Sequence, residues 1–171
     1  MIQANMIKCT TDEFEEYQEF ARQTFVDTYQ HNTDAANLQK YVDENFSEEA
    51  IAKELTDPQC AIFMLKAGDE ILGYVKLRWN TAHPQLDKKS IELQRIYVQK
   101  DYYGKGYGKT LLAYAEQFGR ENGFDWIWLC VWFENHGAIR FYEREGWEKF
   151  GETQFRFGDI VYTDPVFRKG L

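Results

Sequence analysis

Residues 90–110 read SIELQRIYVQKDYYGKGYGKT, and this stretch sets the architecture of the chain. Its first part mixes apolar and polar residues over 91–98, which predicts a strand. Its second part carries Gly104, Gly106 and Gly108, and the apolar run of a helix follows at once. Glycines at such a junction let backbone N–H groups approach a ligand, and the helix N-terminus adds partial positive charge. The stretch therefore predicts a site for a phosphate or pyrophosphate.

The spacing of these glycines can be compared with that of known phosphate-binding motifs. A P-loop places a glycine five residues before Gly108, and that position is Tyr103. A dinucleotide-binding turn places a third glycine three residues after Gly106, and that position is Lys109. Both motifs are excluded, which leaves a Gly-x-Gly-x-Gly junction of another kind. At this point a structural turn without any ligand stays open as the alternative.

Length and composition indicate a globular α/β protein. The 171 residues are 44% apolar and 17% aromatic, which is enough to bury a substantial core. The sequence predicts neither a signal peptide nor a membrane span, because no long apolar segment is present. Cys9, Cys60 and Cys130 fit neither a disulfide framework nor a zinc site. We therefore expect a cytoplasmic protein without a metal, with Cys130 in the core.

Charge is distributed unevenly along a chain whose net charge is −8. Residues 1–60 carry 13 acidic and 4 basic side chains, whereas residues 61–171 carry 15 and 16. This balance argues against a nucleic-acid partner. It is compatible with a cationic small substrate drawn to the acidic part, and equally with a solvated surface that aids solubility.

The rest of the chain alternates strand and helix patterns without a repeat or a linker, so we expect one domain over 1–171. Thr10 with Glu13, Ser47 and Asn135 are the predicted helix N-caps. The expected elements are a strand at 3–9, three helical segments between 10 and 57, a hairpin at 60–79, the strand at 90–98, a helix ending near Gly123, a central strand buried on both faces at 125–133, a short helix from 135 to 146, and closing strands at 147–157 and 160–167.

The order of elements and two motifs resemble the GNAT N-acetyltransferases over nearly the whole chain. In that family a Q/R-x-x-G-x-G/A turn binds acetyl-CoA, and here YGKGYG occupies 103–108. The family block N-x-x-A-x-x-F-Y-E-x-x-G-F matches NHGAIRFYEREGW at 135–147. Tyr103 stands where Gln or Arg is usual, which removes a side-chain donor and leaves the backbone amides. The resemblance implies a GNAT fold, with a mixed, mostly antiparallel sheet of about seven strands and helices on both faces.

The resemblance also implies a site for acetyl-CoA along the central strand and the turn. Backbone groups of Ile96 and Val98 are expected to pair with the pantetheine arm, and Asn135 to bind it, a role compatible with its being an N-cap. The expected contacts of acetyl-CoA are Ile96, Tyr97, Val98, Tyr103, Gly104, Lys105, Gly106, Tyr107, Gly108, Lys109, Thr110, Asn135, Arg140 and Tyr142.

Attack of an amine on a thioester needs a base or a water path, an oxyanion donor and an acid. Tyr142 is the expected general acid, and packing beside Phe141 is its alternative role. Glu92 is the expected base, directly or through water, with solvation or pairing to Arg95 as the alternative. Direct attack in a ternary complex explains these parts, so no acyl-enzyme is expected.

Within the family, the acidic N-terminal helices, ELQRIYV and IWLCVWFEN are most similar to the PaiA-type polyamine acetyltransferases. This implies spermidine or spermine as acceptor, with Asp27, Asp43 and Glu44 among the candidates for binding its ammonium groups. Two alternatives stay open: the same chemistry on an antibiotic, amino acid, protein N-terminus or lysine, and a CoA-binding sensor without turnover, which only Tyr103 favours. Aromatic closing strands permit a homodimer, and no residue decides the oligomeric state.

Overall fold

Strands and helices follow one another in the order that the sequence predicts. A computed structural model describes residues 4–80, 83–86 and 89–171. Its elements are β1 (Asn5–Lys8), η1 (Thr11–Glu13), α1 (Phe14–Tyr29), α2 (Ala35–Asn45), α3 (Glu48–Thr56), β2 (Cys60–Ala67), β3 (Glu70–Arg78), β4 (Ser90–Val98), η2 (Lys100–Tyr102), α4 (Tyr107–Glu121), β5 (Trp126–Cys130), α5 (His136–Arg144), β6 (Glu148–Phe157) and β7 (Ile160–Gly170).

Within the described ranges, the strands form one seven-stranded sheet in the order β1-β2-β3-β4-β5-β7-β6. Among the strands of the described residues, only β4 and β5 run parallel, and every other neighbouring pair is antiparallel. A parallel pair needs a long crossover connection, and here α4 supplies it. The prediction of a mixed, mostly antiparallel sheet of about seven strands is confirmed.

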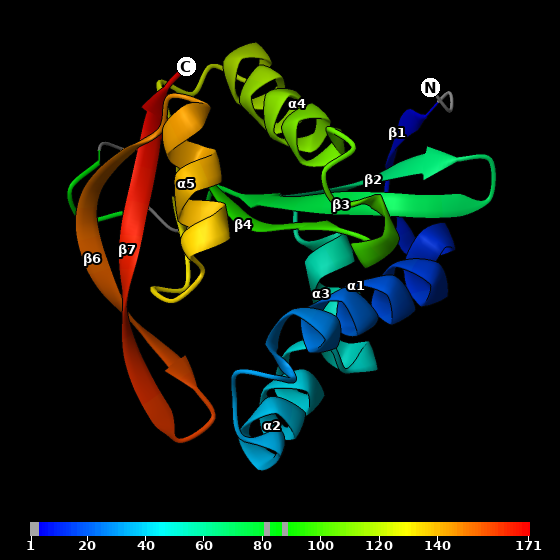
Figure 1. Cartoon of the computed structure of the whole chain (residues 1–171). Helices are drawn as coiled ribbons and strands as arrows, with labels where there is room; N and C mark the ends of the chain where they lie inside the picture. Colours follow the sequence, from blue (N-terminus) through cyan, green and yellow to red (C-terminus); the bar gives the residue numbers. More distant parts are fainter. Residues whose placement is uncertain (1–3, 81–82, 87–88) are drawn as a thin grey trace.

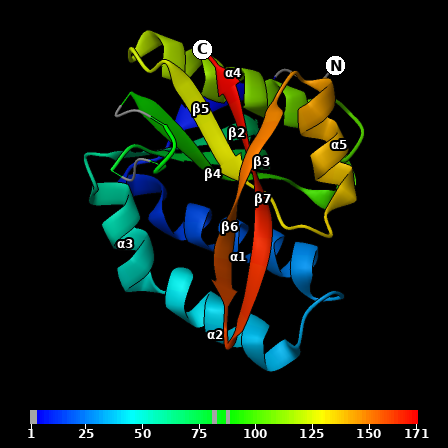
Figure 2. The ribbon, with the colours of Figure 1, turned by 90° about the vertical axis from the view of Figure 1, so that its left-hand side faces the viewer.

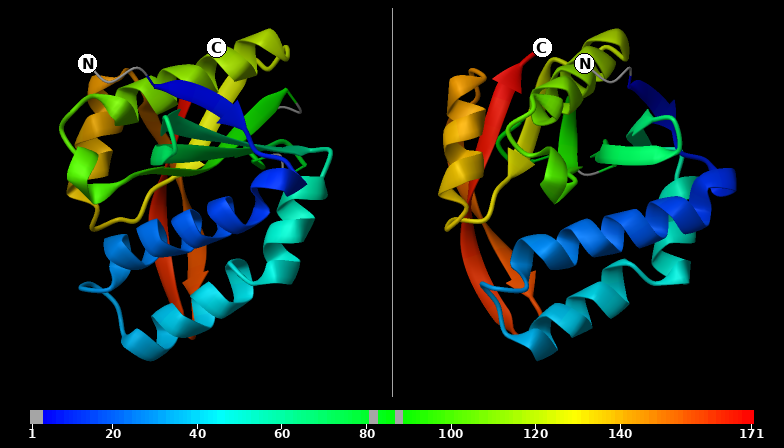
Figure 3. Two further views of the ribbon diagram at one scale, coloured as in Figure 1. Left: turned by 90° about the vertical axis from the view of Figure 1, so that its right-hand side faces the viewer. Right: turned by 45° about the vertical axis from the view of Figure 1, so that its right-hand side comes forward.

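Helices cover both faces of the sheet, as predicted. Helix α4 packs on β3 and β4 from one side, while α1 and α3 contact β4 and β2 from the other (Figure 1). Each side has its own apolar cluster: Leu72, Leu111 and Ile127 belong to the α4 side, and Ile51 and Met64 to the α1–α3 side. Burial of both faces provides the main favourable free energy for folding. Figure 3 shows α1 directly below the sheet and α2 further below it.

The long hairpin of β6 and β7 reaches beyond the sheet to α2 (Figure 2). At its turn, the Asp159 N–H donates to Asn37 Oδ1 over 3.0 Å, and Lys40 pairs with the Asp159 carboxylate at 2.8 Å. Tyr41 stacks on Phe157, with ring centroids 4.9 Å apart. Helix α2 and the hairpin, which are more than 100 residues apart in sequence, therefore form one wall.

The predicted helix caps are present. Glu13 and Thr10 form a reciprocal capping box, but it begins the 3-10 turn η1, and α1 follows from Phe14. Ser47 Oγ accepts the Ala50 N–H at the start of α3. Within the described part of the chain, no helix is long and apolar enough to cross a membrane.

The expectation of a fully buried strand at 125–133 is wrong at its C-terminal end. Strand β5 ends at Cys130, which is exposed rather than part of the core. The reason lies in the neighbouring strand: β4 and β5 pair only from Ser90↔Trp126 to Glu92↔Trp128 and then separate. The end of β5 consequently borders an opening in the sheet.

A buried charge cluster joins α3 to the sheet. Glu54 on α3 pairs with Lys76 of β3 and, at 3.0 Å, with Arg95 of β4. Tyr17 of α1 donates its hydroxyl to Glu54 over 3.2 Å, and Arg95 lies 4.5 Å from the Phe46 ring centroid. One carboxylate therefore balances two cations that are each less than a tenth exposed.

Candidate active site

A cleft of about 1220 Å³ opens where β4 and β5 separate. After Glu92, strand β4 pairs with β3 alone among the described strands, so its other edge faces the cleft. Gln94 is skipped in the pairing, because Leu93 lies opposite Leu77 and Arg95 opposite Lys76. A bulge of this kind bends the strand and re-aims its side chains. An open strand edge offers N–H and C=O groups with which an extended ligand can pair.

The glycine turn continues directly from this open edge. Gly104 and Gly106 adopt left-handed φ values of 75° and 89°, and a Cβ on either would have no heavy atom within 4 Å. The first hydrogen bond of α4 runs from Thr110 N to Gly106 O over 3.1 Å. The preceding N–H groups of the helix have no acceptor inside it, which is the usual condition of a helix N-terminus. They provide the donors and the partial positive charge that an anion needs.

Cations surround the mouth of the cleft near this turn. Lys109 lines the cleft and pairs with Glu145 at 3.1 Å. Arg144, at the end of α5, also lines it and is exposed. Arg140 does not line the cleft, and Lys105 lies over the Tyr102 ring at 4.6 Å.

Tyr142 on α5 lies across the cleft from β4. Its side chain is 6% exposed and packs against Phe141 and Trp147, with ring centroids 5.4 and 5.8 Å away. Burial, followed by the charge of Tyr29, raises the pKa of Tyr142 well above its ordinary value. The phenol therefore remains protonated at neutral pH and can donate a proton to a stronger base.

Glu92 lies on the cleft wall within an ion pair. It is 6% exposed, and its Oε2 accepts a hydrogen bond from Arg78 Nε on the neighbouring strand. The alternative of pairing with Arg95 is not observed, because Arg95 binds Glu54. His83 borders the cleft beside Glu92's neighbour Trp128, with ring centroids 5.2 Å apart.

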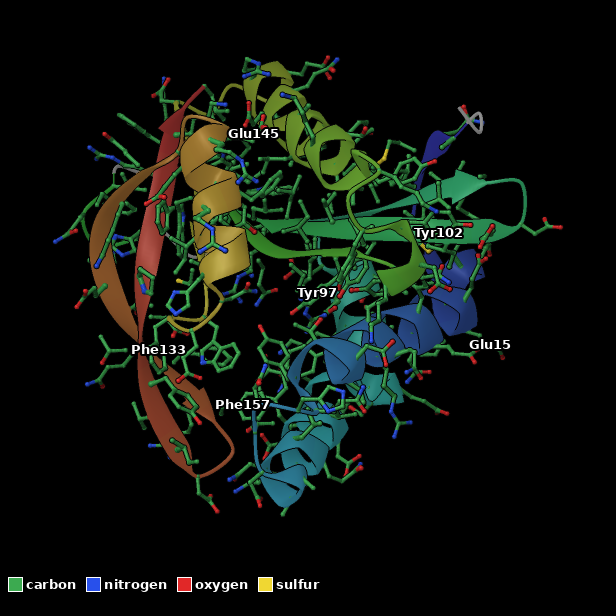
Figure 4. The ribbon with its side chains drawn as sticks, in the orientation of Figure 1. Glu15, Tyr97, Tyr102, Phe133, Glu145 and Phe157 are labelled. Atoms are coloured by element: carbon green, nitrogen blue, oxygen red, sulfur yellow. The ribbon has the colours of Figure 1, made fainter. Side chains whose placement is uncertain are left out.

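The cleft has two halves that differ in their linings. The turn half comprises the free edge of β4, the glycine turn and α5. The aromatic half lies between α1–α2 and β6–β7, where Tyr97 and Phe157 point into a common space (Figure 4). Its rings are Phe25, Tyr29, Tyr41, Tyr97, Trp132, Phe155, Phe157 and Tyr162.

Most predicted site residues come together in this cleft. Lys105, Thr110 and Arg140 lie outside its lining. The expected receptors of ammonium groups, Asp27, Asp43 and Glu44, lie outside it as well, because the helices turn aromatic and small polar residues toward the cleft. The predicted residues that line it are Glu92, Ile96, Tyr97, Val98, Tyr103, Gly104, Gly106, Tyr107, Gly108, Lys109, Asn135 and Tyr142.

Sequence reasoning missed several polar residues of the cleft. Gln94 Oε1 and Trp128 Nε1 are buried there without a hydrogen-bond partner in the described structure. Asp164 of β7 is 4% exposed, and its Oδ1 accepts the Phe133 N–H over 3.1 Å. Asp164 precedes a proline in a closing strand, and no local pattern distinguishes such a residue from a strand-end polar group. Its burial depends on the fold.

Among the described residues, no group of three His, Cys, Asp or Glu side chains is placed to hold a metal ion. The donors present include instead the backbone amides of the turn, the free strand edge and the protonated phenol of Tyr142. Together they suit an extended ligand that ends in phosphates and carries a leaving group to be protonated near Tyr142.

Comparison with known proteins gives a consistent result. The model of the acetyltransferase (GNAT) family matches residues 14–147. An uncharacterized N-acetyltransferase of Lactobacillus delbrueckii subsp. lactis is 30% identical over 172 residues, covering 100% of this chain and 99% of that protein. A spermidine N(1)-acetyltransferase of Thermoplasma acidophilum is 25% identical over 145 residues, covering 82% of this chain and 86% of the relative.

The fold has a close counterpart among solved structures. The crystal structure of the PaiA N-acetyltransferase of Thermoplasma acidophilum, in complex with coenzyme A, superposes with a TM-score of 0.79. The alignment covers 99% of each chain at 21% sequence identity.

Proposed function

The chain belongs to the acetyltransferase (GNAT) family and is an N-acetyltransferase that uses acetyl-CoA; we propose that it acetylates a small primary amine, with a polyamine such as spermidine or spermine as the first candidate. The observation that carries the proposal is the free edge of β4 running into the glycine turn, with the buried Tyr142 phenol on the facing helix. We treat residues 1–171 as one catalytic domain.

In this proposal the turn half holds acetyl-CoA. The pyrophosphate lies against the amides that begin α4, with Lys109 and Arg144 nearby, and the pantetheine arm extends along Ile96–Val98. The absence of Cβ atoms at Gly104 and Gly106 leaves room for the phosphates. Asn135 Oδ1 caps α5 by accepting the Ala138 N–H, so its amide nitrogen is left to donate to the pantetheine arm.

The reaction is a direct transfer with both substrates bound. The amine nitrogen forms a bond to the acetyl carbon, and the bond from that carbon to sulfur breaks. Tyr142 donates its hydroxyl proton to the departing thiolate and regains a proton from water, while the surplus proton of the amine passes to water or to Glu92. Because Glu92 is already paired with Arg78, we favour a water between the amine and this carboxylate.

Two observations support a polyamine acceptor. The spermidine N(1)-acetyltransferase relative covers most of this chain, and the aromatic half suits methylene chains. The Asp27, Asp43 and Glu44 contacts expected for its ammonium groups are withdrawn, because these residues do not line the cleft.

The test is release of CoA from acetyl-CoA, followed with a thiol reagent. The panel contains spermidine, spermine, an aminoglycoside, amino acids and a lysine peptide. We expect release that depends on spermidine or spermine, and a product that is N-acetylated by mass spectrometry. Release only with another amine would retain the mechanism and reject the polyamine.

A Tyr142→Phe control separates catalysis from binding. The variant should bind CoA as the wild type does and turn over far more slowly. A wild-type protein that binds CoA but acetylates no amine would favour the alternative of a CoA-binding sensor. Failure to bind CoA would contradict the proposal that the glycine turn binds the pyrophosphate.

Cellular location and assembly remain predictions. Cys9, Cys60 and Cys130 are free thiols, in agreement with a reducing compartment, and we propose the cytoplasm. The homodimer is checked by sedimentation equilibrium over a range of protein concentrations.

A further inference from the structure

Asp164 is the feature of the cleft that the proposed mechanism does not use. It lies in the aromatic half, on β7, and 4% of it is exposed. Its one hydrogen bond in the described structure is the Phe133 N–H, which satisfies Oδ1. Burial raises the pKa of this carboxyl group, and the Phe133 N–H acts in the opposite direction. Burying a carboxylate is costly unless a cation or further donors accompany it.

The other carboxylates of the cleft lining each have a cation. Glu92 pairs with Arg78, Glu145 with Lys109, and Glu152 with Lys149. Asp164 has no such partner among the residues that the structure describes. It is therefore the one acidic group of this lining, within the described chain, whose charge is left for a ligand.

Aromatic residues are among the neighbours of this carboxylate in the chain and in the cleft lining. Phe133, whose N–H binds Asp164, lies 5.9 Å from the Tyr162 ring, and Tyr162 precedes Asp164 by two residues. On the facing helix α1, burial raises the pKa of Tyr29, and the charge of Asp164 adds to this effect as a smaller cause; the Tyr29 ring lies 5.7 Å from the Trp132 ring. Ring faces attract ammonium groups, and their attraction strengthens in a partly desolvated site.

The carboxylate lies within the same cleft as the reacting groups. Desolvation, followed by the charges of Glu92 and then Asp164, raises the pKa of the Cys130 thiol to about 12, so both carboxylates act near the end of β5. An amine that attacks must itself be neutral, and it lies beside β4. The charge on Asp164 consequently suits a second nitrogen of the same acceptor, one that stays protonated.

We propose that Asp164 and the rings around it bind a distal ammonium group of the acceptor, so that the enzyme selects diamines and polyamines over monoamines. This inference rests on the proposed function and specifies the residue that recognises the substrate class. The methylene groups between the two nitrogens of the acceptor would lie along the rings of the aromatic half, where apolar contact is favourable.

The experiment compares 1,4-diaminobutane and spermidine with n-butylamine, which has one nitrogen and a four-carbon chain. Asp164→Asn keeps an oxygen for the Phe133 N–H and removes the charge. We expect it to lower kcat/KM for the two polycations by about tenfold or more, through KM, and to leave n-butylamine within about twofold. Asp159→Asn is the matched control, because it removes the same charge from the same hairpin outside the cleft lining. It should leave kcat/KM unchanged for the two polycations and for n-butylamine.

Three outcomes would overturn the inference. The first is a wild-type enzyme without preference for polycations, and the second is an Asp164→Asn variant that keeps the preference. The third is an equal loss of kcat for all amines, which would indicate a structural role or a general base.

A binding measurement keeps this inference distinct from the proposed function. Calorimetric titration of 1,4-diaminobutane into the CoA complex of each variant needs no turnover. If no amine releases CoA, weaker binding to Asp164→Asn alone would still support the site, and unchanged binding would reject it.

Discussion

The turn half of the cleft comes mainly from one continuous stretch, residues 93–110, which α5 faces. The aromatic half instead combines side chains from α1, α2, Tyr97 of β4, the segment after β5 and the β6–β7 hairpin. In the turn half, the ligand groups are mostly backbone: a free strand edge and the first amides of α4. In the aromatic half, they are side chains that the fold brings together from distant positions. The charges differ too, because Lys109 and Arg144 line one half and Asp164 the other.

This contrast follows from the two kinds of ligand. A pyrophosphate is recognised well by helix amides and glycines, which a short motif encodes completely. An acceptor amine is recognised by the shape and charge of side chains, so each family member can change it without altering the backbone. The two halves should therefore respond differently to substitution.

The largest expected effect concerns the framework of the aromatic half. Glu54→Gln removes the single carboxylate that Lys76 and Arg95 share, and leaves two buried cations unbalanced. We expect unfolding to become easier by about 3–5 kcal/mol, measured by urea denaturation. A loss under about 1 kcal/mol would mean that this half does not depend on the cluster.

Tyr142→Phe tests the group that serves both halves. The ring and its packing against Trp147 stay, and only the hydroxyl is lost. We expect kcat to fall about 100-fold with KM for acetyl-CoA unchanged. Tyr114→Phe on α4, outside this cleft, is the control. An unchanged kcat in the Tyr142 variant would assign the phenol to packing alone.

Gly106→Ala tests the backbone character of the turn half. Gly106 and the hairpin residue Gly68 both have positive φ, at 89° and 62°, and open space around a Cβ. Both alanine variants should lose stability by about 1 kcal/mol through backbone strain. Only Gly106→Ala should weaken CoA binding, by about tenfold, because its methyl group enters the phosphate site. Equal CoA binding by the two variants would contradict the location of that site.

Arg144→Ala compares a residue found in the structure with one expected from the sequence. Arg144 lines the cleft and Arg140 does not. KM for acetyl-CoA should rise about threefold in Arg144→Ala, and less at high salt, since the contact is exposed. Arg140→Ala should match the wild type in steady-state kinetics. A higher KM in Arg140→Ala, with Arg144→Ala unchanged, would instead support the sequence-based prediction that Arg140 contacts acetyl-CoA.

Lys76→Met has the smallest expected effect and complements Glu54→Gln. Burial, and then repulsion by Arg95, lowers the pKa of Lys76 to about 8, below its ordinary value of 10.5. Between these values the unfolded chain binds a proton that the folded chain does not, so stability from this group rises with pH there. The Lys76→Met variant should lose this rise of stability with pH. At pH 7 its free energy of unfolding should change by under about 1 kcal/mol, because the Glu54 carboxylate then faces Arg95 alone. Urea denaturation from pH 7 to 10.5 measures the free energy of unfolding and its dependence on pH. A rise with pH that persists in the variant would exclude Lys76 as its source.

Local patterns in the sequence were sufficient for the order of the elements and for the strand that runs into the glycine turn. Thr10, Ser47 and Asn135 are found as caps, and the glycine turn follows its strand as expected. These features depend on neighbours within a few residues, where backbone geometry and capping are determined. Tyr142 belongs here too, because its motif places it on a short helix after the central strand.

The aromatic half and its charges were decided by the tertiary structure. Cys130 seemed to belong to a core strand, but the separation of β4 and β5 exposes it. Glu92 and Arg78 meet because they lie opposite each other in the pairing of β3 with β4. Arg95 binds Glu54, a residue of α3 that lies 41 positions earlier in the sequence. Asp164 stands out only when the hairpin is packed against α1 and α2. Burial and pairing arise between distant segments, so residue order alone contains no local signal for them.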